Sequence, residues 1–191
     1  MPRITKEPAE RRQEILDTAM RLFYEKGYEK TSITDIAKEM GVAQGLCYRY
    51  FSSKEMIFDT ALEQYAQMQV TQMTKGILES AHSLKQIICE MPTFLDVEKD
   101  DNFYYKVCHG EESIKTHYQL SMKVCEKMLP IIQQLLDKAI EKKEIEPMDT
   151  HVAASFCVYG QLGILLEKTM TGEERVAKIK EFLLKILNLA G

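Results

Sequence analysis

Residues 31–55 read TSITDIAKEMGVAQGLCYRYFSSKE, and this stretch decides the fold. Four apolar residues in it recur at offsets of 0, 3, 4 and 7, the spacing of one face of an α-helix: Ile33, Ile36, Ala37 and Met40. Ser32 and Asp35 form the pattern of a capping box at the start of this helix, and Gly41 can end it. The sequence therefore predicts an unusually short helix of about two turns.

A second short helix is predicted directly after Gly41. Its apolar face is made by three residues: Cys47, Tyr50 and Phe51. Ser52 with Glu55 then gives a further capping-box pattern, for a long helix that begins near residue 53. Two short helices joined by a glycine-containing turn are typical of a helix-turn-helix, whose second helix fits the DNA major groove. Two helices that merely pack together fit the same spacing, so the spacing alone leaves both interpretations open.

Helical spacing also dominates the rest of the chain. A first helix has an apolar face made by four residues: Ile15, Ala19, Leu22 and Phe23. Longer helical patterns follow, interrupted at Pro92 and Gly172, and no segment alternates like a β-strand. We therefore expect an all-α protein with an N-terminal three-helix helix-turn-helix domain at residues 1–53. It is fused to a larger C-terminal helical bundle at residues 54–191.

Composition limits the kinds of partner that the chain can bind. Its 191 residues include 25 Lys and Arg against 29 Asp and Glu, a formal net charge of −4 at pH 7. Residues 1–60 hold ten charges of each sign, so the acidic excess lies in residues 61–191. This balance argues against a nucleic-acid binder that works by bulk charge alone, but not against one that gathers its cations on one surface.

Several features of the sequence point to the cytoplasm. The five Cys are scattered and odd in number, which does not fit a disulfide scaffold. The first residues have no apolar core after their charges, so we do not expect a signal peptide. The most apolar stretch, residues 152–166, is too short for a bilayer, and we expect no membrane contact.

Residue by residue, the stretch at 31–55 resembles the signature of the TetR family of bacterial transcriptional repressors. The residues before it fit the first helix of that family: Arg12, Ile15, Leu16, Ala19, Leu22, Phe23, Gly27 and Tyr28. The resemblance is dense over residues 11–58 and looser at residues 144–149. It implies a homodimeric repressor that binds a near-palindromic operator in double-stranded DNA and is released by an unknown small-molecule effector.

The resemblance also implies which residues contact DNA: Thr31, Gln44, Gly45, Leu46, Tyr48, Arg49, Tyr50 and Lys54. Gln44 and Gly45 would read base edges, because an amide pairs with adenine and glycine lets the backbone approach the groove. Tyr48 and Lys54 would hold phosphates, with Thr31 on the opposite strand.

Two residues depart from the family pattern. Ala43 stands where the family usually has Ser or Thr to cap the reading helix, which should cost about 1 kcal/mol of local stability. Cys47 stands where a larger aliphatic residue is preferred, so we expect its side chain to point inward. A redox role is the alternative for this thiol.

The middle of the chain carries aromatic, Met and Cys residues that could line an effector cavity, as the corresponding helices do in the proteins that this one resembles. They are Met91, Phe94, Phe103, Tyr104, Cys108, Tyr118 and Met122. Ordinary core packing explains such residues equally well.

The last helix has more apolar surface than a peripheral helix of a monomer needs. Gly160 and Gly163 in the preceding helix permit close helix contact. Together they predict a two-fold interface built from the last two helices of each chain. Its residues would be Phe156, Gly160, Gly163, Ile179, Phe182, Leu183, Ile186 and Leu187.

A metal- or thiol-based sensor or enzyme that uses Cys108, His109 and His117 is the rival hypothesis. These residue types bind metals, but their spacing is not that of a structural zinc site. The sequence also has no G-x-S-x-G, no glycine-rich phosphate loop and no H-E-x-x-H. We therefore expect no enzyme, no metal and no cofactor.

Overall fold

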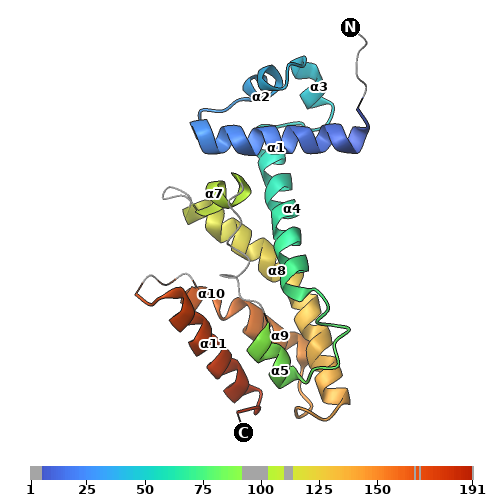
Figure 1. Cartoon of the computed structure of the whole chain (residues 1–191), viewed down its shortest axis with the longest axis vertical. Coiled ribbons are helices and arrows are strands. Elements are labelled where there is room, and N and C mark those ends of the chain that lie inside the picture. The colour runs from blue at the N-terminus through green and yellow to red at the C-terminus, as the bar shows by residue number, and fades with distance from the viewer. Residues whose placement is uncertain (1–5, 92–102, 110–113, 166, 168, 191) are drawn as a thin grey trace. The chain divides into compact units, whose positions relative to one another are not determined.

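A computed structural model describes residues 6–91, 103–109, 114–165, 167 and 169–190 (Figure 1). Within these residues all regular structure is helical, which confirms the predicted all-α class. The helices are α1 (Pro8–Lys26), α2 (Ile33–Glu39), α3 (Gln44–Tyr48), α4 (Lys54–Thr74), α5 (Leu84–Glu90), α7 (Phe103–His109), α8 (Ile114–Glu141), α9 (Thr150–Tyr159), α10 (Leu162–Leu165) and α11 (Gly172–Ile186). None of the described helices is long and apolar enough to cross a bilayer.

The chain forms two compact units. The N-terminal unit contains Met1–Tyr65 and Asp100–Leu120, and the C-terminal unit contains Ala66–Lys99 and Ser121–Gly191. The predicted boundary at residue 53 lies inside the first of these units. The difference has two causes: the first turns of α4 complete the core under α1–α3, and α7 packs against α1.

Local capping sets the ends of the helices in the N-terminal unit. The predicted capping box of α2 is present: Ser32 Oγ accepts from the amide of Asp35, and the Asp35 carboxylate accepts from the amide of Ser32. The cap of α4 differs from the prediction by one residue, because Ser53 Oγ, and not that of Ser52, accepts from the amide of Met56 at 3.1 Å.

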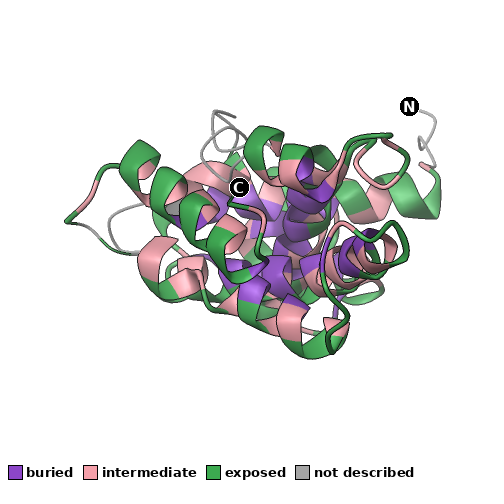
Figure 2. Cartoon of the chain, turned by 90° about the horizontal axis from the view of Figure 1, so that it is seen from below, coloured by how far each residue is buried: buried purple, intermediate pink, exposed green. Residues whose placement is uncertain are grey.

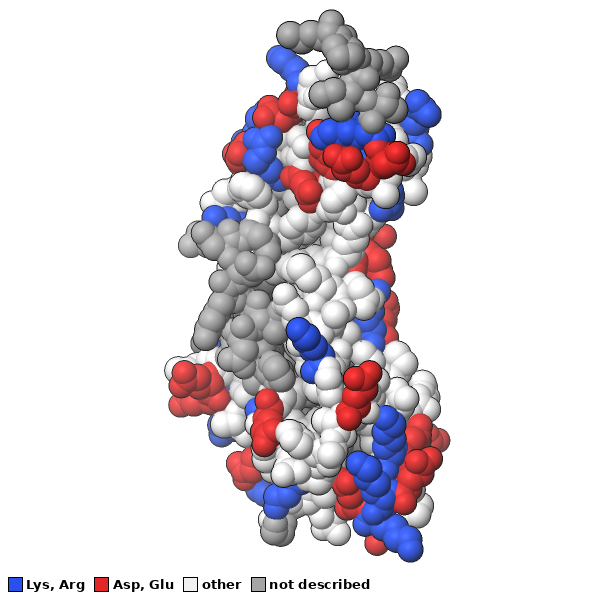
Figure 3. Space-filling model, turned by 45° about the vertical axis from the view of Figure 1, so that its right-hand side comes forward, with Lys and Arg blue, Asp and Glu red and all other residues white. Residues whose placement is uncertain are grey.

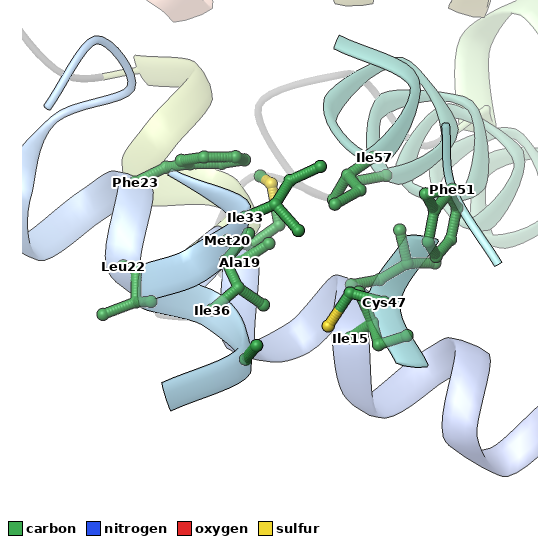
Figure 4. Packing of buried hydrophobic residues seen from close by; sticks show 13 residues of the cluster. Ile15, Ala19, Met20, Leu22, Phe23, Ile33, Ile36, Cys47, Phe51 and Ile57 are labelled. Carbon is green, nitrogen blue, oxygen red and sulfur yellow. The ribbon is translucent and has the colours of Figure 1, made fainter. Parts of the chain in front are cut away.

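The core of the N-terminal unit lies between α1, α2, α3 and the start of α4 (Figure 4). Its largest fully buried members include Ile15, Leu16, Ile36, Phe51 and Ile57. They come from α1, α2, the turn after α3 and the start of α4, so the short helices α2 and α3 are held by tertiary packing more than by their own length.

In the C-terminal unit, side chains also cap three of the helices. Ser83 caps α5, Asp149 caps α9 and Thr171 caps α11. Buried leucines, alanines and an isoleucine of α5, α8 and α9, together with Ile145 and Leu187, form a core of this unit. Figure 2 shows buried stripes on individual helices with exposed residues opposite them, as expected for amphipathic helices.

Candidate nucleic-acid interface and effector cavity

The turn between α2 and α3 has a defined geometry. Gly41 has φ +65°, a left-handed conformation that glycine adopts without steric cost. Its amide donates to the carbonyl of Lys38 at 3.1 Å, and the amide of Val42 donates to that of Ala37 at 2.9 Å. This pair of bonds is a Schellman motif, which ends α2 and fixes the direction in which α3 begins.

Helix α3 is attached to the unit by its inward side. Cys47 is fully buried, which confirms the inward orientation predicted from sequence, and its sulfur points into the core in Figure 4. Burial raises the pKa of this thiol, so it stays protonated at neutral pH. Ala43 occupies the N-cap in an extended conformation and makes no side-chain cap, so α3 depends on its packing.

The outward side of α3 presents the predicted DNA-contacting residues. Gln44, Gly45 and Arg49 are exposed, and Tyr48 is 50% exposed. Among the other members of the predicted set, Leu46 and Tyr50 are half-buried. The structure therefore brings an amide, a phenol and a guanidinium together along one short helix and its C-cap.

One residue near this surface escaped the sequence analysis. Thr34, in the first turn of α2, accepts a hydrogen bond from Nε2 of Gln44 at 2.8 Å. This bond links the two helices and orients the Gln44 amide. In the sequence, this role of Thr34 is indicated only by a hydroxyl-bearing residue near the start of the first helix of the helix-turn-helix.

Lys54 begins α4 and is half-buried. Its ammonium donates to the backbone carbonyl of Tyr28 at 2.8 Å and lies 4.2 Å from the centre of the Tyr28 ring. Lys54 therefore joins the start of α4 to the loop after α1. An ammonium has three donors, so this bond leaves donors for a phosphate oxygen.

Thr31 occupies a different environment from the one predicted. It is 2% exposed, and its hydroxyl donates to the carbonyls of Gly27 at 2.9 Å and Leu22 at 3.3 Å. This corrects its assignment as a phosphate contact, because a buried side chain engaged with the end of α1 is not presented to DNA. Its polarity satisfies carbonyls at a helix terminus.

Charge is balanced over the N-terminal unit. Arg21 binds Glu39 at 2.8 Å and Glu25 at 3.5 Å, and Arg11 binds Glu14 at 2.6 Å. The hydrogen bond from Arg21 lowers the pKa of Glu39. Lys, Arg, Asp and Glu are interspersed on the face in Figure 3. Ion pairs with glutamates therefore neutralise Arg11 and Arg21 within this unit.

The C-terminal unit contains a cavity of about 190 Å³. Its wall consists mainly of aliphatic and sulfur-containing side chains from α4, α5, α8, α9, α10 and α11, among them Met73, Leu84, Met128, Cys157 and Leu183. Burial raises the pKa of both thiols in the wall, that of Cys125 to about 11. The wall is therefore apolar and carries no thiolate at neutral pH.

The residues predicted to line an effector cavity are divided between the two units. Met91 lines the cavity of the C-terminal unit. Three others, Phe103, Tyr104 and Cys108, belong to α7, where Tyr104 donates to the Asp17 carboxylate at 2.8 Å.

The remaining three members of that set have different surroundings. Tyr118 also belongs to the N-terminal unit and is exposed, as is Met122 in the C-terminal unit. Phe94 lies outside the described residues. The sequence-based set therefore remains a prediction, and Met91 is its one member among the described residues that line the cavity.

The predicted dimer residues divide into two groups. Three large apolar side chains face solvent: Phe156, which is 74% exposed, Phe182 and Ile186. Gly160 and Gly163, which follow Phe156 in the sequence, are also exposed. The others turn inward, since the apolar cavity is lined by three of them: Ile179, Leu183 and Leu187. The apolar residues of α11 thus form two groups: some line the cavity of their own unit, and others form an exposed apolar surface.

The residues of the rival metal-site hypothesis do not form a described cluster. Cys108 is buried, which raises the pKa of its thiol to about 12. The side chain of His109 lies outside the described residues. Within the part of the chain that is described, no group of three or more His, Cys, Asp or Glu could hold a metal ion.

The helix-turn-helix segment matches a protein-family model. Residues 15–61 match the model of bacterial regulatory proteins of the tetR family. The nucleoid occlusion factor SlmA of Haemophilus influenzae is 27% identical over 127 residues, which are 65% of this chain and 58% of SlmA. The uncharacterized HTH-type transcriptional regulator YvdT of Bacillus subtilis is 29% identical over 136 residues, 70% of this chain and 69% of YvdT. The match therefore spans less than two thirds of the length of SlmA.

Solved structures extend the likeness to the rest of the chain. Salmonella enterica GusR aligns with a TM-score of 0.66 at 18% identity, over 97% of this chain and 100% of GusR. A transcriptional regulator of the TetR/AcrR family from Thermobifida fusca aligns with a TM-score of 0.60 at 22% identity, over 92% of this chain and 97% of its own. These matches establish a common fold for nearly the whole chain.

Proposed function

Because the chain belongs to the TetR family of bacterial regulatory proteins and is a transcriptional regulator of that type, we propose that it is a ligand-responsive repressor. In this proposal a homodimer binds a near-palindromic operator, and a small-molecule effector releases it. Repression and release together require a DNA-reading surface, a two-fold interface and an effector site.

The observation that carries the proposal is the orientation of α3. Its apolar residue Cys47 is buried, whereas Gln44, Tyr48 and Arg49 face solvent. An amide, a phenol and a guanidinium are groups that hydrogen-bond to base edges and phosphates, so this exposed side can contact DNA. The Gln44 amide, oriented by Thr34, is suited to an adenine edge.

Exposed apolar side chains support the two-fold interface. Phe156 of α9 and Phe182 and Ile186 of α11 would otherwise leave large apolar surfaces in water. A dimer formed through these helices would present two copies of α3 about 34 Å apart, one turn of DNA, which is why a near-palindrome is expected.

The cavity of the C-terminal unit supports an effector site. An effector releases DNA only if it binds the released form more tightly, and couplings of about 1–3 kcal/mol change DNA affinity by several-fold to about a hundredfold. Helix α4 is the proposed connecting lever. It contributes Ile57 to the core under α3 and Met73 to the cavity wall.

Arg49→Gln tests the electrostatic part of DNA binding. Arg49 is exposed, and no ion pair is found for it among the described residues. We expect the variant to lose affinity for all duplexes alike and to reduce the slope of log K against log salt by about 0.9 per lost phosphate contact. Fluorescence anisotropy at several salt concentrations measures both. Lys185→Gln, in α11, is the control, and an unchanged slope for Arg49→Gln would remove Arg49 from the interface.

Gln44→Ala tests base reading and the proposed function as a whole. Selection from random duplexes should yield a near-palindrome with the wild-type protein. With Gln44→Ala the preference at one position of each half-site should relax, with about a tenfold loss on the best sequence. Thr34→Val, which removes only the orienting bond, should have a smaller effect at the same position. Recovery of no enriched sequence by the wild type would refute the repressor proposal.

A further inference from the structure

The cavity wall of the C-terminal unit has a distinctive charge composition. Of the described residues that line it, Lys180 is the one that carries a charge, and Ser121 and Gln161 are the neutral polar ones. Gln161 Nε2 donates to the carbonyl of Cys157 at 2.8 Å. The thiols in the wall are protonated at neutral pH because burial raises their pKa. Among the described residues, the wall therefore includes one cationic side chain and no anionic one.

Lys180 is half-buried and is held by carbonyls only. Its ammonium donates to the carbonyl of Cys89 at 2.7 Å and to that of Met91 at 3.3 Å, at the C-terminal end of α5. No carboxylate pairs with it among the described residues. Two carbonyls occupy two of the three donors of the ammonium. Among the described residues the ammonium therefore has no counter-charge, and its third donor can bind one.

The size of the cavity limits the ligand. A volume of about 190 Å³ is somewhat larger than a cavity of about 150 Å³ that accepts benzene. A compact ligand of about ten non-hydrogen atoms therefore fits. The flexible side chains of Met73, Met91 and Met128 allow the wall to adapt to an aliphatic chain.

We propose that this cavity binds an aliphatic monocarboxylate of medium chain length. Its hydrocarbon part lies against the Met, Leu and Ile side chains, and its carboxylate accepts a hydrogen bond from the ammonium of Lys180. We expect cations to be excluded, because the described part of the wall offers them no acidic partner. The regulatory meaning of this site rests on the proposed function, since binding matters for repression only if it also changes DNA affinity.

Calorimetry on the DNA-free full-length protein tests the ligand class. Octanoate is compared with 1-octanol and octylammonium, which have the same chain with neutral and positive headgroups, all below their aggregation concentrations. We expect octanoate to bind about tenfold more tightly than octanol and octylammonium not to bind. Equal affinity for octanoate and octanol, or no binding of octanoate, would overturn the proposal.

Variants of α11 test the role of Lys180. Lys180→Gln should lower octanoate affinity about tenfold, to the level of octanol, while Lys180→Arg keeps the charge and should retain most of the affinity. Lys178→Gln removes an exposed charge two residues away and should change the affinity for neither octanoate nor octanol. Circular dichroism checks that each variant is folded. Undiminished octanoate binding by folded Lys180→Gln would refute the assignment, and if that variant unfolds, the wild-type ligand series decides alone.

A separate DNA assay keeps this inference distinct from the proposed function. Octanoate is added to the wild-type complex with its selected operator. Release of DNA by octanoate supports both the ligand site and the proposed function. If octanoate binds in calorimetry but does not release DNA, the ligand site is supported and octanoate is refuted as the effector. If no carboxylate gives a calorimetric signal or affects DNA binding, the ligand site is refuted and the DNA-binding proposal remains intact.

Discussion

Phe51→Ala is expected to lower the free energy of unfolding of the N-terminal unit by about 3–5 kcal/mol. Phe51 is 1% exposed, it belongs to the core cluster with Ile15 and Ile57, and the Arg12 guanidinium lies 4.9 Å from its ring centre. Removing the ring leaves a cavity directly behind α3 and ends that cation–π contact. Urea unfolding followed by circular dichroism measures the change.

Phe51→Ala should also weaken DNA binding, because helix α3 loses the packing that holds it in place. Helix α3 has only five residues and no side-chain cap at Ala43, so it has little stability of its own. Tyr48→Ala is the matched control, because that ring is 50% exposed and its removal should change stability by less than about 0.5 kcal/mol. If Phe51→Ala unfolds at the same urea concentration as the wild type, the packing of α3 described above is incorrect.

Gln69→Met is expected to stabilise the protein by about 1–3 kcal/mol. Gln69, in α4, is fully buried, and among the described residues neither its amide nitrogen nor its carbonyl oxygen has a hydrogen-bond partner. Burying an unpaired amide is unfavourable, whereas methionine has a similar shape and no such group to desolvate. Thermal unfolding should show a rise of about 2–4 °C for each kcal/mol.

Gln67→Met is the control for helix propensity and side-chain length. Gln67 lies two residues earlier on α4 and is exposed, so its replacement should change stability by less than about 0.5 kcal/mol. A loss of stability in Gln69→Met would contradict the prediction. It would mean that a buried water molecule satisfies the Gln69 amide in solution.

The N-terminal helices were predictable because their signals are local. Ser32 with Asp35, and Gly41, act within a few residues of their own positions, and each fixes a helix end as expected. The one-residue error at α4 has the same origin. Adjacent Ser52 and Ser53 both offer a hydroxyl, and only the three-dimensional path of the turn decides which of them caps the helix.

The candidate sites were less predictable, because they depend on which way a side chain turns. Thr31 has the polarity of a phosphate contact, yet it closes the end of α1 instead. On α11, Phe182 and Leu183 are neighbours in one apolar stripe, but the first faces solvent and the second lines the cavity. The cavity itself is assembled from helices distant in sequence, so no spacing along the chain could have identified Lys180 as part of its wall.

The even mixture of charges around the helix-turn-helix has a consequence for the search along a genome. Random DNA attracts proteins almost entirely through released counterions, and a reading unit whose acids and bases nearly cancel gains little from that source. Few molecules are then sequestered on the vast excess of unrelated sequence. We therefore expect a modest number of copies per cell to suffice for occupancy of the cognate site.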